Sequence, residues 1–210
     1  MTTPEQALKV RVALLVCLPT LQGVPAIAAR PSPADLVDVR RIAPGICVEL
    51  RYATAHNVFG RRLYAHSRCL LRRAVAERLG RVQRRLAREG YGLKIWDAYR
   101  PHSVQRVMWR IHPRGGYVGD PRHGSFHNRG VAVDLTLVRT DGRPVAMPSG
   151  FDDFSPRAHL DYPGVSAAVR ENRARLLHAM RAEGFIPYRR EWWHFVAPDY
   201  RRYPMLDRPL

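Results

Sequence analysis

The longest apolar pattern in the chain has helical spacing and lies between Cys69 and Glu89. One stripe of positions is apolar and arginines fill most of the others; the stripe consists of Leu70, Leu71, Val75, Leu79, Val82 and Leu86. A repeat near 3.6 residues predicts an amphipathic helix over residues 69–89 that ends before Gly90. We expect its arginine face to lie in solvent.

Two further stretches predict helices. Ser103 would cap a short helix that runs to Ile111, because a serine side chain can accept a hydrogen bond from the free N–H groups of a first helical turn. Another helix would begin at Ser166 and end at Gly184.

Alternating or continuous apolar runs predict strands in the rest of the chain. These runs cover residues 37–52, 93–99, 131–139, 143–147 and 185–196. Thr140-Asp-Gly142 is a turn signal, so 131–139 and 143–147 are expected to pair as an antiparallel hairpin. The pattern predicts one α+β domain with a central antiparallel sheet and helices packed to one side.

Four polar residues lie at or near the ends of these predicted strands. His127 and Asp134 flank Gly130, and Glu191 and His194 follow much later in the chain. Imidazole and carboxylate groups suit zinc, and a catalytic zinc usually takes three protein ligands and leaves one position to water. The pattern predicts that His127, Asp134 and His194 hold one zinc ion and that Glu191 accepts the proton of the water. The alternative is that all four are ordinary polar residues at strand ends.

Glu191 and His194 raise a geometric question. Residues three apart on a regular strand point to opposite faces, so these two side chains meet only if a turn or bulge intervenes. Trp192 and Trp193 between them should lie on either side of the strand, one in the core and one against the site.

Several motifs resemble a known superfamily. Ser125-x-His127-x-x-Gly130-x-Ala132-x-Asp134 and Glu191-x-Trp193-His194 are similar to the zinc D,D-peptidases, which include murein carboxypeptidases, D-Ala-D-Ala dipeptidases and hedgehog signalling domains. Trp96-Asp97-Ala98-Tyr99-Arg100-Pro101 resembles the dipeptidase branch. The resemblance covers roughly residues 46–197. It implies a hedgehog/D,D-peptidase-like zinc fold and zinc-dependent hydrolysis of the D-Ala-D-Ala dipeptide in cell-wall turnover.

The same resemblance implies roles for four more residues. Arg100 would stabilise negative charge on the carbonyl oxygen under attack, Asp152 would bind the free ammonium of the substrate, and Ser125 and Tyr52 would contact it. Each residue also has a structural alternative. Arg100 could form an ion pair with Asp97, Asp152 could cap a turn, Ser125 could be an ordinary loop residue, and Tyr52 could belong to the core.

Two departures from the family pattern leave the size of the substrate open. Asn57-Val-Phe-Gly60 displaces an aromatic residue by one position, and Pro148 stands where a glycine is expected. The alternatives to a dipeptidase are a murein D,D-carboxypeptidase or endopeptidase on the same scaffold and, in another class, a zinc-containing binding module. Glu191 argues against the binding module, which has little need of a positioned base.

Length and charge narrow the choice of partners. The 210 residues fit one domain, and the formal net charge is +17, almost all of it from arginine. The arginines are scattered rather than clustered with aromatic residues, which argues against nucleic acid as a partner. Loose association with anionic cell-wall polymers is more plausible, and no segment predicts stable insertion into a membrane.

The amino terminus resembles a secretory signal peptide. Lys9 and Arg11 precede an apolar run, which ends in small residues near Ala28 and Ala29. We expect residues 1–29 to be removed on export to the periplasm and residues 30–210 to form the catalytic domain; the alternative is a cytoplasmic protein. Cys47 and Cys69 would remain, either paired or as free thiols.

Overall fold

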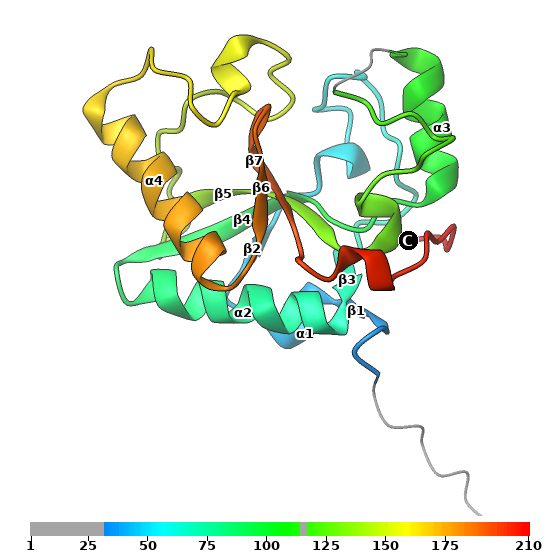
Figure 1. Ribbon diagram of the computed structural model, residues 1–210, viewed down its shortest axis with the longest axis horizontal. Coiled ribbons are helices and arrows are strands. Elements are labelled where there is room, and N and C mark those ends of the chain that lie inside the picture. The colour runs from blue at the N-terminus through cyan, green and yellow to red at the C-terminus, as the bar shows by residue number, and fades with distance from the viewer. Residues whose placement is uncertain (1–31, 114–116) are drawn as a thin grey trace, which may run out of the picture. The chain divides into compact units, whose positions relative to one another are not determined.

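A five-stranded sheet forms the centre of the protein, with the strand order β2-β4-β5-β7-β6 (Figure 1). The computed structural model describes residues 32–113 and 117–210. The strands are β2 (Cys47–Val48), β4 (Tyr91–Asp97), β5 (Ala132–Arg139), β6 (Ile186–Tyr188) and β7 (Glu191–Val196). Three of the four strand pairs are antiparallel, whereas β2 runs parallel to β4. The predicted α+β class is confirmed, with a sheet that is mixed at one edge.

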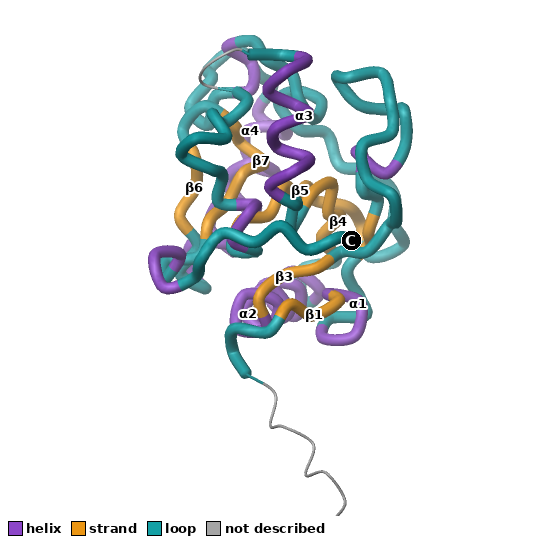
Figure 2. Tube along the Cα trace, turned by 90° about the vertical axis from the view of Figure 1, so that its right-hand side faces the viewer, coloured by secondary structure: helices purple, strands orange, loops and turns teal. Residues whose placement is uncertain are grey.

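Four α-helices accompany this sheet within the described residues: α1 (Val39–Ile42), α2 (Arg73–Ala87), α3 (His102–Ile111) and α4 (Ala167–Ala182). Helix α2 packs against β4, and α4 packs against α2, β5 and β6. Helix α3 lies apart from α2 in both views (Figures 1 and 2). None of the described helices has the length and apolar character needed to cross a bilayer.

The helix predicted over residues 69–89 is correct in its body and wrong at its start. Its apolar stripe is buried, with Leu79, Val82 and Leu86 fully inaccessible. However, Leu70–Arg72 form strand β3, which pairs with β1 (Leu36–Asp38) in a separate two-stranded sheet. Apolar residues at the end of a helical pattern fit a buried strand equally well, so spacing alone could not separate the two elements.

The predicted hairpin between residues 131–139 and 143–147 is correct at its turn, where the Arg139 N–H bonds the Arg143 carbonyl, but wrong as an extended pair of strands. Strand β5 pairs with β4 on one side and with β7 on the other. Only an isolated bridge joins Val138 to Pro144, and proline has no N–H group with which to extend a ladder. Within the predicted strand region 37–52, Val39 begins α1 and Arg51–Ala53 form the 3-10 helix η1.

One of the two predicted helix caps is correct. The Ser166 hydroxyl accepts a hydrogen bond from the Val169 N–H at the start of α4. Ser103 does not cap α3, which begins one residue earlier, at His102. Instead, the Ser103 N–H donates to the carboxylate of Asp207 at 2.7 Å, so the C-terminal part of the chain supplies the acceptor.

Cys47 and Cys69 are both free thiols, which answers the question that the sequence left open. Cys47 is exposed, whereas Cys69 is buried in the core. Burial raises the pKa of Cys69, so this side chain stays protonated.

Candidate active site

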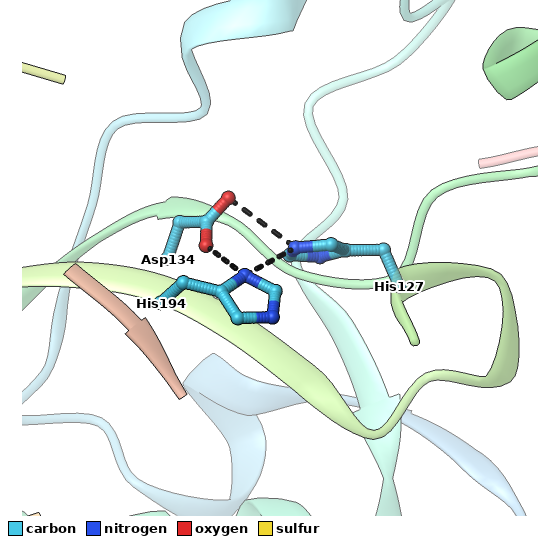
Figure 3. Close-up of side chains that lie close together, drawn as sticks. All are labelled: His127, Asp134 and His194. Carbon is cyan, nitrogen blue, oxygen red and sulfur yellow. Dashed lines mark hydrogen bonds and ion pairs between the residues drawn. The ribbon is translucent and has the colours of Figure 1, made fainter. Parts of the chain in front are cut away.

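Asp134 and His194 face each other across neighbouring strands. β5 and β7 pair with Asp134 opposite His194, so the two side chains emerge on the same face of the sheet. His127 comes from the 3-10 helix η2 (His127–Arg129), which precedes β5. Gly130 turns the chain into β5 with a φ of 70°, a conformation that glycine adopts without strain. Figure 3 shows the three side chains pointing toward one another.

The distances between the donor atoms of these side chains suit a metal ion. His194 Nδ1 lies 2.8 Å from Asp134 Oδ1, and His127 Nε2 lies 3.3 Å from both Asp134 Oδ2 and His194 Nδ1. A tetrahedral centre with bonds of about 2.0–2.1 Å would hold its ligand atoms roughly 3.3 Å apart. The three residues therefore fit a small metal ion.

The neighbours of His127 fix the direction of its ring. Its Nδ1 lies 2.6 Å from the carbonyl oxygen of Ala98. Because a carbonyl can only accept, Nδ1 must carry the proton, and the lone pair of a neutral ring then lies on Nε2, which faces Asp134 and His194. Burial alone would raise the pKa of Asp134. The His127 and His194 imidazoles lower it by a larger amount, so the pKa is below its ordinary value and this carboxylate stays ionised.

Glu191 and His194 do converge, because the β6–β7 ladder is irregular between them. Tyr188 pairs with Glu191, whereas Pro187 pairs with Phe195, so three residues of β7 have no partner on β6. This bulge brings Glu191 Oε2 to 3.9 Å from His194 Nδ1. Burial raises the pKa of Glu191 to about 8, and a group that titrates near neutral pH can both accept and release a proton. Trp193 lines the same cavity, and Trp192 is buried against Ser149.

Arg100 is buried and already holds a carboxylate. Its Nε and Nη2 donate to Asp97 Oδ2 at 3.1 and 2.6 Å, and its Nη1 donates to Gln105 at 2.8 Å. A guanidinium has five N–H groups, so these bonds leave one on each Nη atom. Arg100 also lines the cavity, so it can keep its ion pair with Asp97 and still donate hydrogen bonds to a ligand.

Tyr52 and Asp152 meet although they lie 100 positions apart in sequence. The Tyr52 hydroxyl donates to the Asp152 carboxylate at 3.0 and 3.2 Å. Burial raises the pKa of Asp152 to about 7. Asp152 also has a φ of 57°, and it is the one residue other than glycine with a positive φ in the described part of the chain. Such a strained conformation is common at ligand-binding positions.

A cavity of about 560 Å³ unites the predicted residues. All eight line it: Tyr52, Arg100, Ser125, His127, Asp134, Asp152, Glu191 and His194. The Ser125 hydroxyl accepts from the His127 N–H at 3.3 Å, so it also supports η2. A cavity of this volume, with carboxylates and a guanidinium among aromatic walls, can bind a small polar ligand.

Sequence reasoning missed several residues that build this site. The rings of Tyr117 and Phe154 stack with their centroids 4.6 Å apart, and both line the cavity. They lie in loops, whose sequence has no apolar periodicity that could have indicated them. Gln105 supports Arg100 from α3, and Tyr64 donates to Asp97. The polar residue on the buried face of the predicted helix, Gln105, was the one signal in the sequence that could have indicated such a contact.

The family model and the similar proteins of known name all point to one family. A family model described as "D-ala-D-ala dipeptidase" matches residues 32–208. The D-alanyl-D-alanine dipeptidase of Escherichia coli K12 is 39% identical over 172 residues, which cover 82% of this chain and 89% of that protein. The proteins of the same name from Enterococcus faecium and Streptomyces coelicolor are each 34% identical, over 75% and 79% of this chain and 89% and 92% of their own lengths.

The ion pair between Asp97 and Arg100 leads to a stability prediction. Asp97→Ala would leave the Arg100 guanidinium buried without a carboxylate, so we expect the free energy of unfolding to fall by about 3–5 kcal/mol. Asp161→Ala is the control, because Asp161 pairs with Arg189 in solvent and should contribute less than about 1 kcal/mol. Urea denaturation of both variants measures the difference. Equal losses in the free energy of unfolding would show that the buried ion pair contributes no more than the exposed one.

Proposed function

Because the chain belongs to the D-Ala-D-Ala dipeptidase family, we propose that it hydrolyses D-alanyl-D-alanine to D-alanine, with one zinc ion held by His127, Asp134 and His194. The observation that carries the proposal is the convergence on one cavity of these three residues, the base Glu191 and the carboxylate of Asp152. Cell-wall turnover is the process in which such a dipeptide would be released.

Zinc is the metal that this donor set favours. Two imidazoles and one carboxylate, with donor atoms about as far apart as tetrahedral geometry requires, match its usual ligands. When bound, zinc lowers the pKa of water from about 15.7 toward roughly 7 and polarises a carbonyl group.

Proton transfer during hydrolysis falls to Glu191. As the water oxygen attacks the amide carbon, its proton passes to the Glu191 carboxylate; as the C–N bond breaks, Glu191 gives a proton to the leaving amino group. A pKa of about 8, raised by burial, allows both transfers near neutral pH. The free N–H groups of Arg100 would stabilise the negative charge that builds on the carbonyl oxygen.

Asp152 would hold the free ammonium group of the dipeptide. Its carboxylate is partly buried, lines the cavity and has a fixed direction, because the Tyr52 hydroxyl bonds both of its oxygens. A buried carboxylate favours a cationic partner, since the opposite charge restores the stability that the ionised form loses on burial. This role would restrict the enzyme to substrates with a free amine next to the cleaved bond.

Substrate choice can be tested with one pair of compounds. We expect zinc-loaded protein to cleave free D-Ala-D-Ala and to cleave N-acetyl-D-Ala-D-Ala with kcat/KM lower by at least about tenfold, because the blocked compound leaves Asp152 without its charged partner. Asp152→Ala should lose most of this discrimination. Asp153→Ala is the matched control, because Asp153 does not line the cavity. Initial rates by D-alanine release provide the measurement.

The same experiment separates the alternatives. Glu191→Gln should abolish turnover. Equal cleavage of the blocked and free compounds would assign the protein to murein carboxypeptidase or endopeptidase activity instead. No cleavage of either compound, with zinc bound, would leave a zinc-containing binding module.

Zinc binding can be tested without any substrate. We expect one zinc ion per chain and a fall in affinity of more than about 100-fold in His194→Ala, since even changes outside the ligand shell cost 10–100-fold. His178→Ala is the control, because His178 is exposed on α4. Competition with a chromophoric chelator measures both affinities. An unchanged affinity in His194→Ala would exclude this site.

We also propose export to the periplasm. The proposal depends on the sequence of residues 1–29, which lie outside the described residues. Exposed arginines on α2, such as Arg84, and just after it, such as Arg88, would then face the anionic polymers of the cell wall. When the full chain is expressed in a Gram-negative host, N-terminal sequencing should find a mature protein in the periplasm that starts near Ala29. A cytoplasmic protein with residues 1–29 intact would contradict export.

A further inference from the structure

Asn128 uses every polar group that it has. It lies in η2 directly after His127 and is 0% exposed. Its side-chain Oδ1 accepts from the Ser125 N–H and its Nδ2 donates to the Arg100 carbonyl, both at 2.8 Å. Its backbone N–H donates to the Ser125 carbonyl at 3.0 Å, and its own carbonyl accepts from the Leu206 N–H at 2.8 Å.

These bonds connect residues that line the cavity. Two of them close the turn that carries Ser125 and His127, and the third holds the backbone of Arg100. The Arg100 N–H also donates to the His127 carbonyl at 3.2 Å, so η2 binds the Arg100 peptide groups on both sides. The two segments joined in this way, residues 125–128 and Arg100, lie outside the strands, so no sheet ladder aligns them.

The fourth bond attaches Asn128 to the C-terminal segment, Tyr203–Leu210. This segment is itself anchored to Tyr99, two residues after β4, and to the start of α3. The Leu206 carbonyl accepts from the His102 N–H, and the Tyr99 hydroxyl bonds the backbone of Arg208 at 2.7 and 3.0 Å. The segment therefore links η2 to Tyr99 and to the start of α3.

Asparagine suits this position for a chemical reason. The site needs an acceptor for the Ser125 N–H and a donor for the Arg100 carbonyl, side by side at the end of one short arm. Aspartate has no donor, serine is one bond shorter and has a single polar atom, and an apolar residue would leave both backbone groups buried without partners.

We propose that Asn128, held by the C-terminal segment, is a positioning residue that fixes Ser125, His127 and Arg100 relative to one another. The kinetic part of this inference rests on the proposed dipeptidase activity. Asn128 itself does not line the cavity, so it acts only through the residues that it holds.

The test compares Asn128→Ala with Asn172→Ala in the full-length, zinc-loaded protein. Asn172 also donates to a backbone carbonyl, that of Ala146, but lies on α4 away from the cavity. For Asn128→Ala we expect kcat on D-Ala-D-Ala to fall by roughly 10–100-fold with little change in KM, because a displacement of about 1 Å in a catalytic group can cost 10²-fold. Zinc affinity should fall by about tenfold, as for other residues that support metal ligands. Asn172→Ala should change neither quantity.

The melting temperature and a second variant separate positioning from a purely structural role. If Asn128→Ala melts at a lower temperature but keeps the wild-type kcat and zinc affinity, the proposal is overturned. If Asn128→Ala does not fold, Asn128→Ser takes its place, and the same loss of kcat and zinc affinity in a folded protein supports the proposal. If the wild-type protein does not cleave the dipeptide, the proposed function fails, and the zinc affinities alone decide whether Asn128 positions His127.

Discussion

The register between β5 and β7 is the constraint on which the site depends. It places Asp134 opposite His194 on one face of the sheet, whereas Val133 and Leu135, which flank Asp134 on β5, point to the other face and are fully buried. A shift by one residue would move the two side chains to opposite faces and expose part of the core. The same apolar packing that stabilises the fold therefore also aligns two of the three candidate metal ligands.

Around this centre, the pKa values of the carboxyl groups depend on which charged groups lie next to them. Burial disfavours the ionised form of every carboxylate. Asp134 nevertheless stays ionised beside two imidazoles, whereas burial raises the pKa of Asp152 to about 7 and that of Glu191 to about 8. One environment thus provides a permanent anion to hold a metal ion and two carboxyl groups that can change their protonation state near neutral pH. These are the properties that amide hydrolysis with a metal ion requires.

Local patterns predicted elements wherever one physical effect dominates. The apolar stripe predicted α2 because burial of one helix face imposes a 3.6-residue repeat. Ser166 was correctly predicted as a cap because the N–H groups of a first helical turn need an acceptor. Predictions failed where a distant segment competes. Leu70–Arg72 join β1 rather than α2, and Asp207 replaces Ser103 as the partner at the start of α3. Neither partner is visible from a window of neighbouring residues.

The sequence by itself determined the α+β class, the family motifs and the eight residues expected at the site, because each depends on residue type and local spacing. Tertiary structure alone decided how those residues meet. The bulge in β7 turns Glu191 toward His194, the Tyr52 hydroxyl orients Asp152, and Asn128 ties η2 to Arg100 and to the C-terminal segment. The physical reason is the same in each case. Hydrogen bonds and ladder irregularities between distant segments form only after the apolar core has brought those segments together, so no local pattern encodes them.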